Sequence, residues 1–260
     1  MALVVAMLGL GEAGSAIAQD LVARSVTVRG WDPVKAPPGE VVQAGNAQDA
    51  VSGADVVLSV NTAAVALEVA SSVADHLSPG TLYADLNTGA PELKRAVARA
   101  VEAAGALFVD VALMAPVPGR GIATPVLVSG QGAARFAELF APLGMSVEVV
   151  DGRPGSAASR KLLRSVVMKG MAAAVIEGLR AAQRFGCEDW YMSEVRSIFA
   201  GADEALVERL ISGSRRHAVR RSHEMRIVSE MLLSAGVHPR ISMAAAEWLK
   251  ELSVPGQDGR

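Results

Sequence analysis

Hydrophobic residues follow two different patterns along the chain, and the change between them falls near residue 150. Before that point, short runs rich in valine and leucine alternate with stretches of helical periodicity, which is typical of a sheet covered by helices. After it only helical patterns follow, so we predict an α/β fold with a doubly wound, mostly parallel sheet and then a smaller all-α domain. We expect strands at residues 3–8, 25–31, 56–60, 81–85, 107–111, 125–129 and 146–150.

A long helix is expected to join the two parts, because residues 156–185 contain no helix breaker except isolated glycines, and Gly186 supplies a stop. Thirty helical residues would span about 45 Å, which is long for a crossover helix and suits an interdomain helix. The predicted domains are therefore 1–154, the interdomain helix 155–186, and 187–260, whose polar end at 255–260 we expect to fray. Other helices are expected at 91–105, 188–198, 203–211, 215–234 and 240–252.

The turn after the first expected strand has the glycine spacing of a Rossmann-type dinucleotide site. Gly9 permits the tight turn, Gly11 lets the backbone approach a pyrophosphate, and Gly14 allows the next helix to pack closely on the sheet. The alternative is a glycine-rich turn in another kind of α/β protein, but Asp32, placed 18 positions after Gly14, favours the nucleotide. The residues expected in this cofactor loop are Gly9, Leu10, Gly11, Glu12, Ala13 and Gly14.

Asp32 also bears on the choice of cofactor. Its carboxylate would accept hydrogen bonds from the adenosine ribose hydroxyls and repel a 2′-phosphate, so NAD is favoured over NADP. Arg29 and Lys35 lie close enough in sequence to receive that phosphate, so NADP stays open.

Two polar loops should lie beside this turn, at the carboxyl ends of strands, where open α/β sheets bind their ligands. Asn61 and Thr62 follow one strand, and Asn87 and Thr88 follow the next. Their amide and hydroxyl groups could hold the nicotinamide ribose. Asn61 and Thr88 could equally be helix N-caps with no role in binding.

A third loop, residues 114–120, is stiffened by prolines and ends in a cation. Pro118, Gly119 and Arg120 form its end, and the guanidinium could clamp a substrate carboxylate. A solvated arginine is the alternative.

The long helix carries Lys161, Ser165 and Lys169 at four-residue spacing, so these side chains share one face. Apolar neighbours and a nearby second ammonium would reduce the proton affinity of a lysine there, which suits acid/base work. Two solvated lysines are the alternative, and the spacing does not separate these readings.

Together these features resemble the β-hydroxyacid dehydrogenase superfamily, which includes 3-hydroxyisobutyrate dehydrogenase, tartronate semialdehyde reductase and 6-phosphogluconate dehydrogenase. The resemblance rests on the glycine loop, on Asp85-Leu86-Asn87-Thr88, on the loop 110–119, and on Gly155 followed six residues later by Lys161; it extends to about residue 186. The chain is most similar to the branch with a 6-phosphogluconate dehydrogenase-like NAD-binding domain and a divergent helical C-terminal domain. The resemblance implies an NAD(P)-dependent oxidoreductase that transfers hydride between nicotinamide and a small hydroxy acid or its oxo or semialdehyde form, with Lys161 as general acid/base.

The chain departs from that family at two positions of the substrate pocket. Ser165 stands where relatives usually have an asparagine that orients the substrate, and Pro118 stands where they have a serine. The resemblance therefore implies the type of reaction more than the substrate, and Arg120, Arg164 and Lys169 are candidates to compensate. Two alternatives stay open: an imine reductase, although such enzymes generally replace the lysine, and a nucleotide-binding regulator that has lost catalysis.

A basic stripe is expected on the helix at 215–234, where His217, Arg220, Arg221 and Glu224 recur at three- and four-residue spacing. It could receive an anionic substrate, although a solvated or ion-paired face is the commoner outcome. The resemblance also implies a homodimer in which the helical domain completes the pocket, and the need to bury an apolar face after so long a helix favours the same.

Composition excludes several other classes of protein. At 260 residues, 51% hydrophobic and 20% charged, the chain has ample material for a buried core. A net charge of -2 gives no indication of nucleic acid, no apolar run is long enough to span a membrane, and a single cysteine excludes an intramolecular disulfide. The four histidines show no metal-ligand spacing. We therefore expect a cytoplasmic enzyme for a small anionic substrate, with no metal, nucleic-acid or membrane partner.

Overall fold

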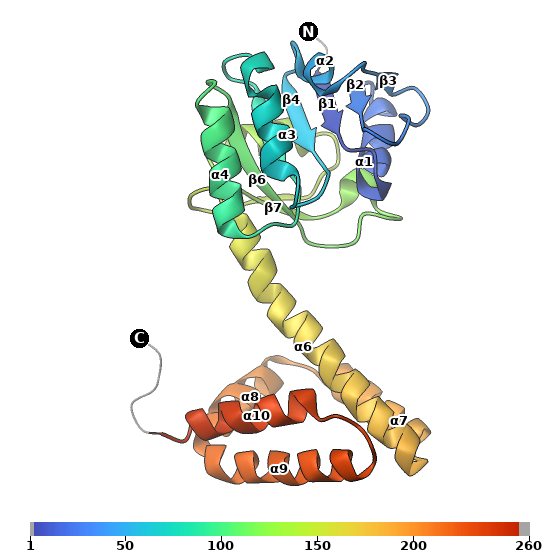
Figure 1. Ribbon diagram of the computed structural model, residues 1–260, viewed down its shortest axis with the longest axis vertical. Helices are drawn as coiled ribbons and strands as arrows, with labels where there is room; N and C mark the ends of the chain where they lie inside the picture. Colours follow the sequence, from blue (N-terminus) through green and yellow to red (C-terminus); the bar gives the residue numbers. More distant parts are fainter. Residues whose placement is uncertain (1–2, 255–260) are drawn as a thin grey trace. The chain divides into compact units, whose positions relative to one another are not determined.

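The computed structural model describes residues 3–254 of the chain, so the fraying expected at 255–260 lies outside the described residues. The chain divides into two compact units, Met1–Arg164 and Ser165–Arg260. Helix α6 (Ser156–Phe185) begins in the first unit and continues into the second (Figure 1). This is the long uninterrupted helix that the sequence predicts.

The first unit is built on one eight-stranded sheet. Its strands are β1 (Val4–Leu8), β2 (Thr27–Trp31), β3 (Val42–Gln43), β4 (Val56–Ser59), β5 (Leu82–Asp85), β6 (Leu107–Leu113), β7 (Val126–Ser129) and β8 (Val147–Val149). They lie in the order β3-β2-β1-β4-β5-β6-β7-β8, and every neighbouring pair is parallel except β6 and β7. The predicted doubly wound, mostly parallel sheet is thus confirmed. The winding reverses between β1 and β4, which is where such sheets bind their ligands.

Helices cover both faces of the sheet because successive side chains of a strand point to opposite faces. Val5 and Met7 of β1 face one core together with α1 (Glu12–Val22) and α5 (Ala133–Phe140). Ala6 and Leu8 face the other core with α2 (Ala47–Val51), α3 (Ala66–Val73) and α4 (Pro91–Glu102). The first unit also contains two short 3-10 turns, η1 (Ala74–His76) and η2 (Gly121–Ala123). Pro91 takes the first helical position of α4, as expected for a proline at a helix start.

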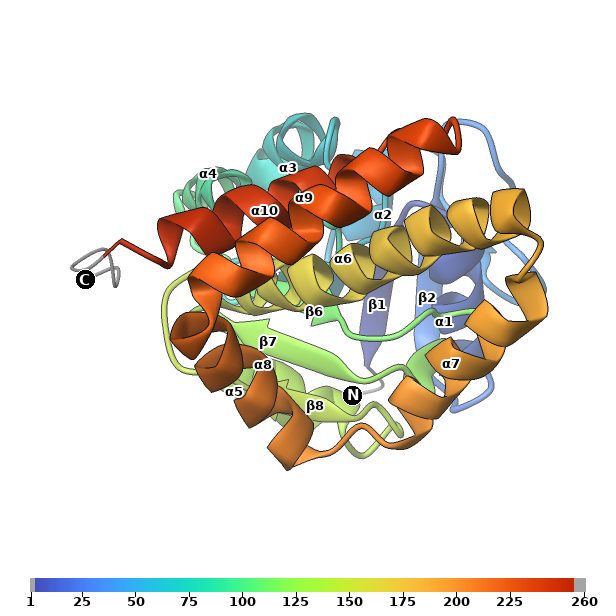
Figure 2. The same ribbon diagram turned by 90° about the horizontal axis from the view of Figure 1, so that it is seen from below.

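The described part of the second unit is all-helical. It contains the rest of α6 and then α7 (Glu188–Ala200), α8 (Glu204–Arg216), α9 (Ala218–Ser234) and α10 (Arg240–Glu251). Figures 1 and 2 show α9 and α10 side by side, and the Ser222 hydroxyl of α9 donates to the Ala246 carbonyl of α10 at 2.9 Å. The helix expected at 215–234 begins instead at Ala218, because His217 leaves the helical conformation (φ -117°, ψ 23°) and separates α8 from α9.

A side chain of α6 caps α10. The residue before α10, Pro239, provides no side-chain cap, and Glu177 takes that role. Its two carboxylate oxygens accept the Ile241 N–H at 2.8 Å, the Ser242 N–H at 2.9 Å and the Ser242 hydroxyl at 2.7 Å. Burial by itself would raise the pKa of Glu177, but the hydrogen bonds from Ser242 and its neighbours outweigh burial and leave the pKa below its usual value. The ionised carboxylate therefore holds two helices together.

We expect Glu177→Ala to reduce the free energy of unfolding by about 1–2 kcal/mol, because it leaves the first N–H groups of α10 without an acceptor. Urea unfolding followed by helical circular dichroism measures this loss. Since the folded-state pKa is lowered, the contribution is present above the pKa of the unfolded carboxyl, about 4.3, and is lost as the pH falls through the folded value. Glu247→Ala, which removes an exposed carboxylate of α10, is the matched control. A difference between wild type and Glu177→Ala that persists undiminished into strong acid would contradict the role of the ionised cap.

Candidate active site

The turn between β1 and α1 requires glycine at two of its three positions. Gly9 has a φ of +105°, and a Cβ there would lie 2.3 Å from the Val60 carbonyl oxygen. A Cβ on Gly14 would lie 2.0 Å from the Gly9 carbonyl oxygen. Gly11 differs, because a Cβ there would meet nothing within 4 Å. The first N–H groups of α1, which have no side-chain cap, therefore lie beside open space of the kind that a diphosphate occupies.

A cleft of about 480 Å³ lies at the carboxyl ends of β1, β2 and β4, where the winding of the sheet reverses. Five of the residues predicted to bind the cofactor line it, namely Gly9, Gly11, Asp32, Asn61 and Thr62. Its lining includes Gly9, Gly11, Trp31, Asp32, Pro33, Val60, Asn61, Thr62 and Val65. The donor set fits a dinucleotide: glycine backbone for the phosphates, a carboxylate for ribose hydroxyls, and apolar side chains for a flat base.

Asp32 is held rigidly at this cleft by backbone N–H groups. Its Oδ2 accepts from Leu10 at 2.8 Å, and its Oδ1 accepts from Val34 at 2.9 Å and Lys35 at 3.0 Å. Burial would raise the pKa of Asp32, but these hydrogen bonds and the charge of Lys35 lower it below its usual value. The carboxylate is therefore ionised at neutral pH. Arg29, which the sequence offered as a partner for a 2′-phosphate, instead donates to the Ser52 carbonyl at 2.7 Å.

The two asparagines at the ends of β4 and β5 converge on one hydroxyl. Asn61 donates to the Ser59 hydroxyl oxygen at 3.0 Å, and Asn87 donates to the same oxygen at 3.3 Å. The amide oxygens of both asparagines are buried and have no hydrogen-bond partner among the described residues. Two acceptors thus stay available for ligand hydroxyl or amide N–H groups. The N-cap positions of α3 and α4 are Val65 and Ala90, so the interpretation of Asn61 and Thr88 as helix caps is wrong.

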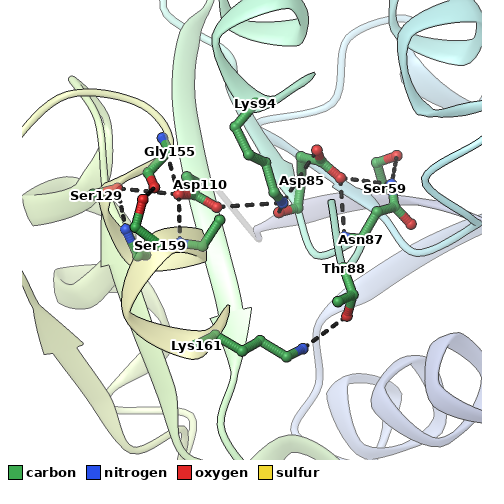
Figure 3. A network of polar contacts seen from close by, with 12 residues as sticks. Ser59, Asp85, Asn87, Thr88, Lys94, Asp110, Ser129, Gly155, Ser159 and Lys161 are labelled. Atoms are coloured by element: carbon green, nitrogen blue, oxygen red, sulfur yellow. Dashed lines mark hydrogen bonds and ion pairs between the residues drawn. The ribbon is translucent and has the colours of Figure 1, made fainter. Parts of the chain in front are cut away.

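The structure brings Lys161 against the loop that follows β5. The half-buried Lys161 Nζ of α6 donates to the Thr88 hydroxyl oxygen at 2.8 Å, across 73 residues of sequence (Figure 3). The two side chains share the lining of a narrow crevice with Asn87, Gly89, Lys94, Asp110, Val111, Ala112, Ala158 and Leu162. The predicted acid/base residue and one predicted ribose ligand therefore meet at the same edge of the sheet as the cofactor cleft.

A buried ion cluster lies behind this crevice, and the sequence reasoning missed its central member. Lys94 of α4 is 1% exposed, and its Nζ lies 3.2 Å from Asp85 Oδ2 and 3.3 Å from Asp110 Oδ1 (Figure 3). It also donates to the Asp85 carbonyl at 2.7 Å. The sequence did hold a signal: Lys94 precedes Val97 and Val101 by three and seven residues, so it lies on the apolar face of its helix.

Asp110 also anchors the helix that carries Lys161. Its Oδ2 accepts the Gly155 N–H at 3.1 Å and the Ala158 N–H at 3.0 Å, and Ser129 Oγ accepts the Ala157 N–H at 3.1 Å. The first turn of α6 is thus capped by strands β6 and β7 rather than by its own flanking residue.

The other predicted substrate ligands fall into two groups. Pro118, Gly119 and Arg120 lie in the loop between β6 and β7, and Arg164 donates to the Met114 carbonyl at the start of that loop at 2.8 Å. Four more belong to the second unit, where Arg220 forms an ion pair with Glu224; they are Ser165, Lys169, His217 and Arg220. A role of either group in substrate binding stays a prediction.

Two expected absences can be examined within residues 3–254. No helix among them combines the length and the apolar character that a membrane crossing requires. The same residues contain no group of three or more histidine, cysteine, aspartate and glutamate side chains arranged to hold a metal ion.

Comparison with known proteins gives two family matches. Residues 4–150 match the NAD binding domain of 6-phosphogluconate dehydrogenase, and residues 182–252 match a domain of unknown function, DUF1932. The NAD-dependent L-serine dehydrogenase of Pseudomonas aeruginosa is 25% identical over 214 residues, which cover 78% of this chain and 72% of that protein.

Solved structures agree with this assignment. A conserved hypothetical protein from Sinorhizobium meliloti is 32% identical, with 100% of this chain and 92% of that chain covered and a TM-score of 0.65. A variant imine reductase from Myxococcus stipitatus, solved with NAD+, is 21% identical, with 96% and 93% covered and a TM-score of 0.80, which shows a shared fold. As the resemblance to the β-hydroxyacid dehydrogenases predicts, the chain belongs to the family of the NAD binding domain of 6-phosphogluconate dehydrogenase, here combined with the DUF1932 helical domain.

Proposed function

We propose that this protein is an NAD(P)-dependent oxidoreductase that interconverts a small hydroxy acid and its oxo or semialdehyde form, with Lys161 as general acid/base. The observation that carries the proposal is the Lys161–Thr88 contact of 2.8 Å, made at the carboxyl end of β5 beside the dinucleotide cleft. The name of the Pseudomonas aeruginosa relative, an L-serine dehydrogenase, supports a hydroxy acid as the class of substrate.

The chemistry divides between the cofactor and the chain. A bound nicotinamide supplies or accepts the hydride at the substrate carbon. In the reducing direction, the Lys161 ammonium donates a proton to the carbonyl oxygen as that carbon is reduced; in the oxidising direction, the Lys161 amine takes the hydroxyl proton. Thr88 accepts one Lys161 N–H, and this hydrogen bond orients the ammonium at the carboxyl end of β5.

The substrate is proposed to be a small anion. Arg120 and Arg164 are the candidate carboxylate ligands in the first unit, and Lys169, His217 and Arg220 are those in the second. Pro118 and Ser165 replace polar groups with which the family binds its substrate. We therefore propose that the substrate acid of this protein differs from the substrates of the better-known relatives.

We expect Lys161→Ala to reduce turnover by about 100-fold or more, the contribution typical of a general acid/base, with little change in the dissociation constant of NADH. The measurement is nicotinamide absorbance over a panel of hydroxy acids that includes L-serine, 3-hydroxyisobutyrate, and bulky and phosphorylated acids. Lys250→Ala, which removes an exposed lysine of α10, is the control. Full activity of Lys161→Ala would refute the assigned mechanism.

The same panel separates the alternatives. Turnover of cyclic imines but of no hydroxy acid would identify an imine reductase, for which the shared fold with the Myxococcus stipitatus protein is the supporting observation. Binding of NADH without turnover of any substrate class would identify a nucleotide-binding regulator.

NAD is the proposed cofactor in preference to NADP, because the ionised Asp32 lies where it would repel a 2′-phosphate. We expect NADH to bind at least about tenfold more tightly than NADPH, and Asp32→Ala to reduce that ratio by about tenfold. Fluorescence titration with both nucleotides measures the ratio, and Glu40→Ala, an exposed charge-matched substitution, is the control. Equal affinities in the wild-type protein would contradict the preference.

A homodimer is proposed through the second unit, whose described residues leave many large apolar side chains exposed. Val166, Val219 and Trp248 are 70%, 71% and 66% exposed, and Trp190 and Ile227 are similar. Exposed apolar surface on this scale is typical of an interface between subunits. We expect light scattering to give a mass of twice 26.9 kDa. A monomeric mass at the concentrations of the activity assay would overturn the proposal.

A further inference from the structure

A row of four buried polar residues crosses the middle of the sheet. Ser59, Asp85, Asp110 and Ser129 are register partners on the neighbouring strands β4, β5, β6 and β7, and none is more than 1% exposed. A buried polar row in a sheet of valine and leucine is costly unless each group has a partner. Lys94 of α4 supplies the partner for the two central carboxylates (Figure 3).

From this arrangement we propose that Lys94 is the positioning residue of the Lys161 site: by bridging Asp85 and Asp110, it holds the Thr88 loop and the start of helix α6 in the one arrangement that lets Lys161 reach Thr88. The inference rests on the proposed function for its catalytic meaning, but the linkage itself is a property of the folded chain.

Asp85 connects Lys94 to the loop that contains Thr88. Asp85 Oδ1 accepts the Asn87 N–H at 3.0 Å and the Asn87 side-chain amide at 2.6 Å. These bonds fix the backbone immediately before Thr88. The other oxygen, Asp85 Oδ2, has no hydrogen-bond partner among the described residues and faces Lys94 at 3.2 Å.

Asp110 connects Lys94 to the start of helix α6. Asp110 Oδ2 binds the N–H groups of Gly155 and Ala158, one turn before Lys161, while Asp110 Oδ1 has no hydrogen-bond partner among the described residues and faces Lys94. Gly155 has a φ of +98°, and a Cβ there would lie 2.9 Å from the Pro91 carbonyl oxygen, so the helix start also touches α4. Loop and helix are therefore each tied to one carboxylate, and the Lys94 ammonium joins the two.

The link also has an electrostatic side. Lys94 of α4 and Asp110 of β6 line the same crevice as Lys161, and Asp85 of β5 is paired with Lys94. Removal of the Lys94 charge leaves these carboxylates without their cation, and unpaired negative charge near an ammonium favours its charged form. A lysine that only filled space would not change the titration of Lys161.

Two variants and one control test the proposal. Lys94→Met removes both the link and the charge. The double variant Lys94→Met/Asp85→Asn removes the link but keeps one net negative charge. It leaves one buried carboxylate without a cation where the single variant leaves two, so we expect it to fold even where the single variant does not. Lys250→Met, on the exposed side of α10, is the control.

The first readout is hydrogen exchange in the full-length protein without substrate. In the double variant we expect the peptides that contain Asn87–Thr88 and Gly155–Lys161 to exchange about tenfold faster together, while the first turn of α1 stays unchanged. Acceleration of only one of the two peptides, or of neither, in a folded double variant overturns the proposal.

The second readout is the pH dependence of acetylation of Lys161 by acetic anhydride, followed by mass spectrometry. We expect folded Lys94→Met to shift the midpoint of Lys161 acetylation upward by about half a pH unit or more. Lys250→Met is expected to leave that midpoint unchanged. An unchanged midpoint in Lys94→Met overturns the proposal. Both readouts need no substrate, so a failure of the proposed reaction would appear in the turnover assays and not here.

Discussion

The ion pairs of the buried Lys94 ammonium are the interaction that connects the Thr88 loop to the start of helix α6. The ammonium lies between carboxylates of two neighbouring strands that are themselves fully buried. Removal of one partner from a buried ion pair typically costs about 3–5 kcal/mol, whereas a well-packed apolar replacement of the whole group is often neutral. Stability alone therefore does not require such a cluster. The cluster orients two segments, because Asp85 uses its second oxygen to bind Asn87 and Asp110 uses its second oxygen to bind the first turn of α6.

The two ends of the site use the same sheet in different ways. At the reversal between β1 and β4, the backbone itself is the binding surface: Gly9 and Gly14 allow close packing, and Gly11 leaves open space above the start of α1. At β5 and β6, side chains form the contacts: a row of buried polar groups orients the loop and the helix that meet at Lys161. Both ends lie at the carboxyl ends of strands of one sheet, which is the edge where open α/β sheets bind their ligands.

Local sequence patterns did not show how the helices begin. Thr88 and Asn61 are residue types that often cap helices, but they lie two or more residues before the cap positions of α4 and α3. The start of α6 is capped by Asp110 of β6 and Ser129 of β7. The start of α10 is capped by Glu177, 64 residues from Ile241. The helix expected across His217 was continuous in pattern, but the chain bends there between α8 and α9.

The sequence by itself determined the alternation of strands and helices followed by helices alone, the glycine turn, Asp32 and the long helix with Lys161, because hydrophobic periodicity and glycine spacing are local properties of the chain. Only the tertiary structure decided that Asp85 and Asp110 are neighbours, that Lys94 is buried between them, and that Lys161 reaches Thr88. Those contacts depend on strand register and on the side of the sheet that α4 covers. Both are set by packing of the whole unit, so no window of sequence contains them.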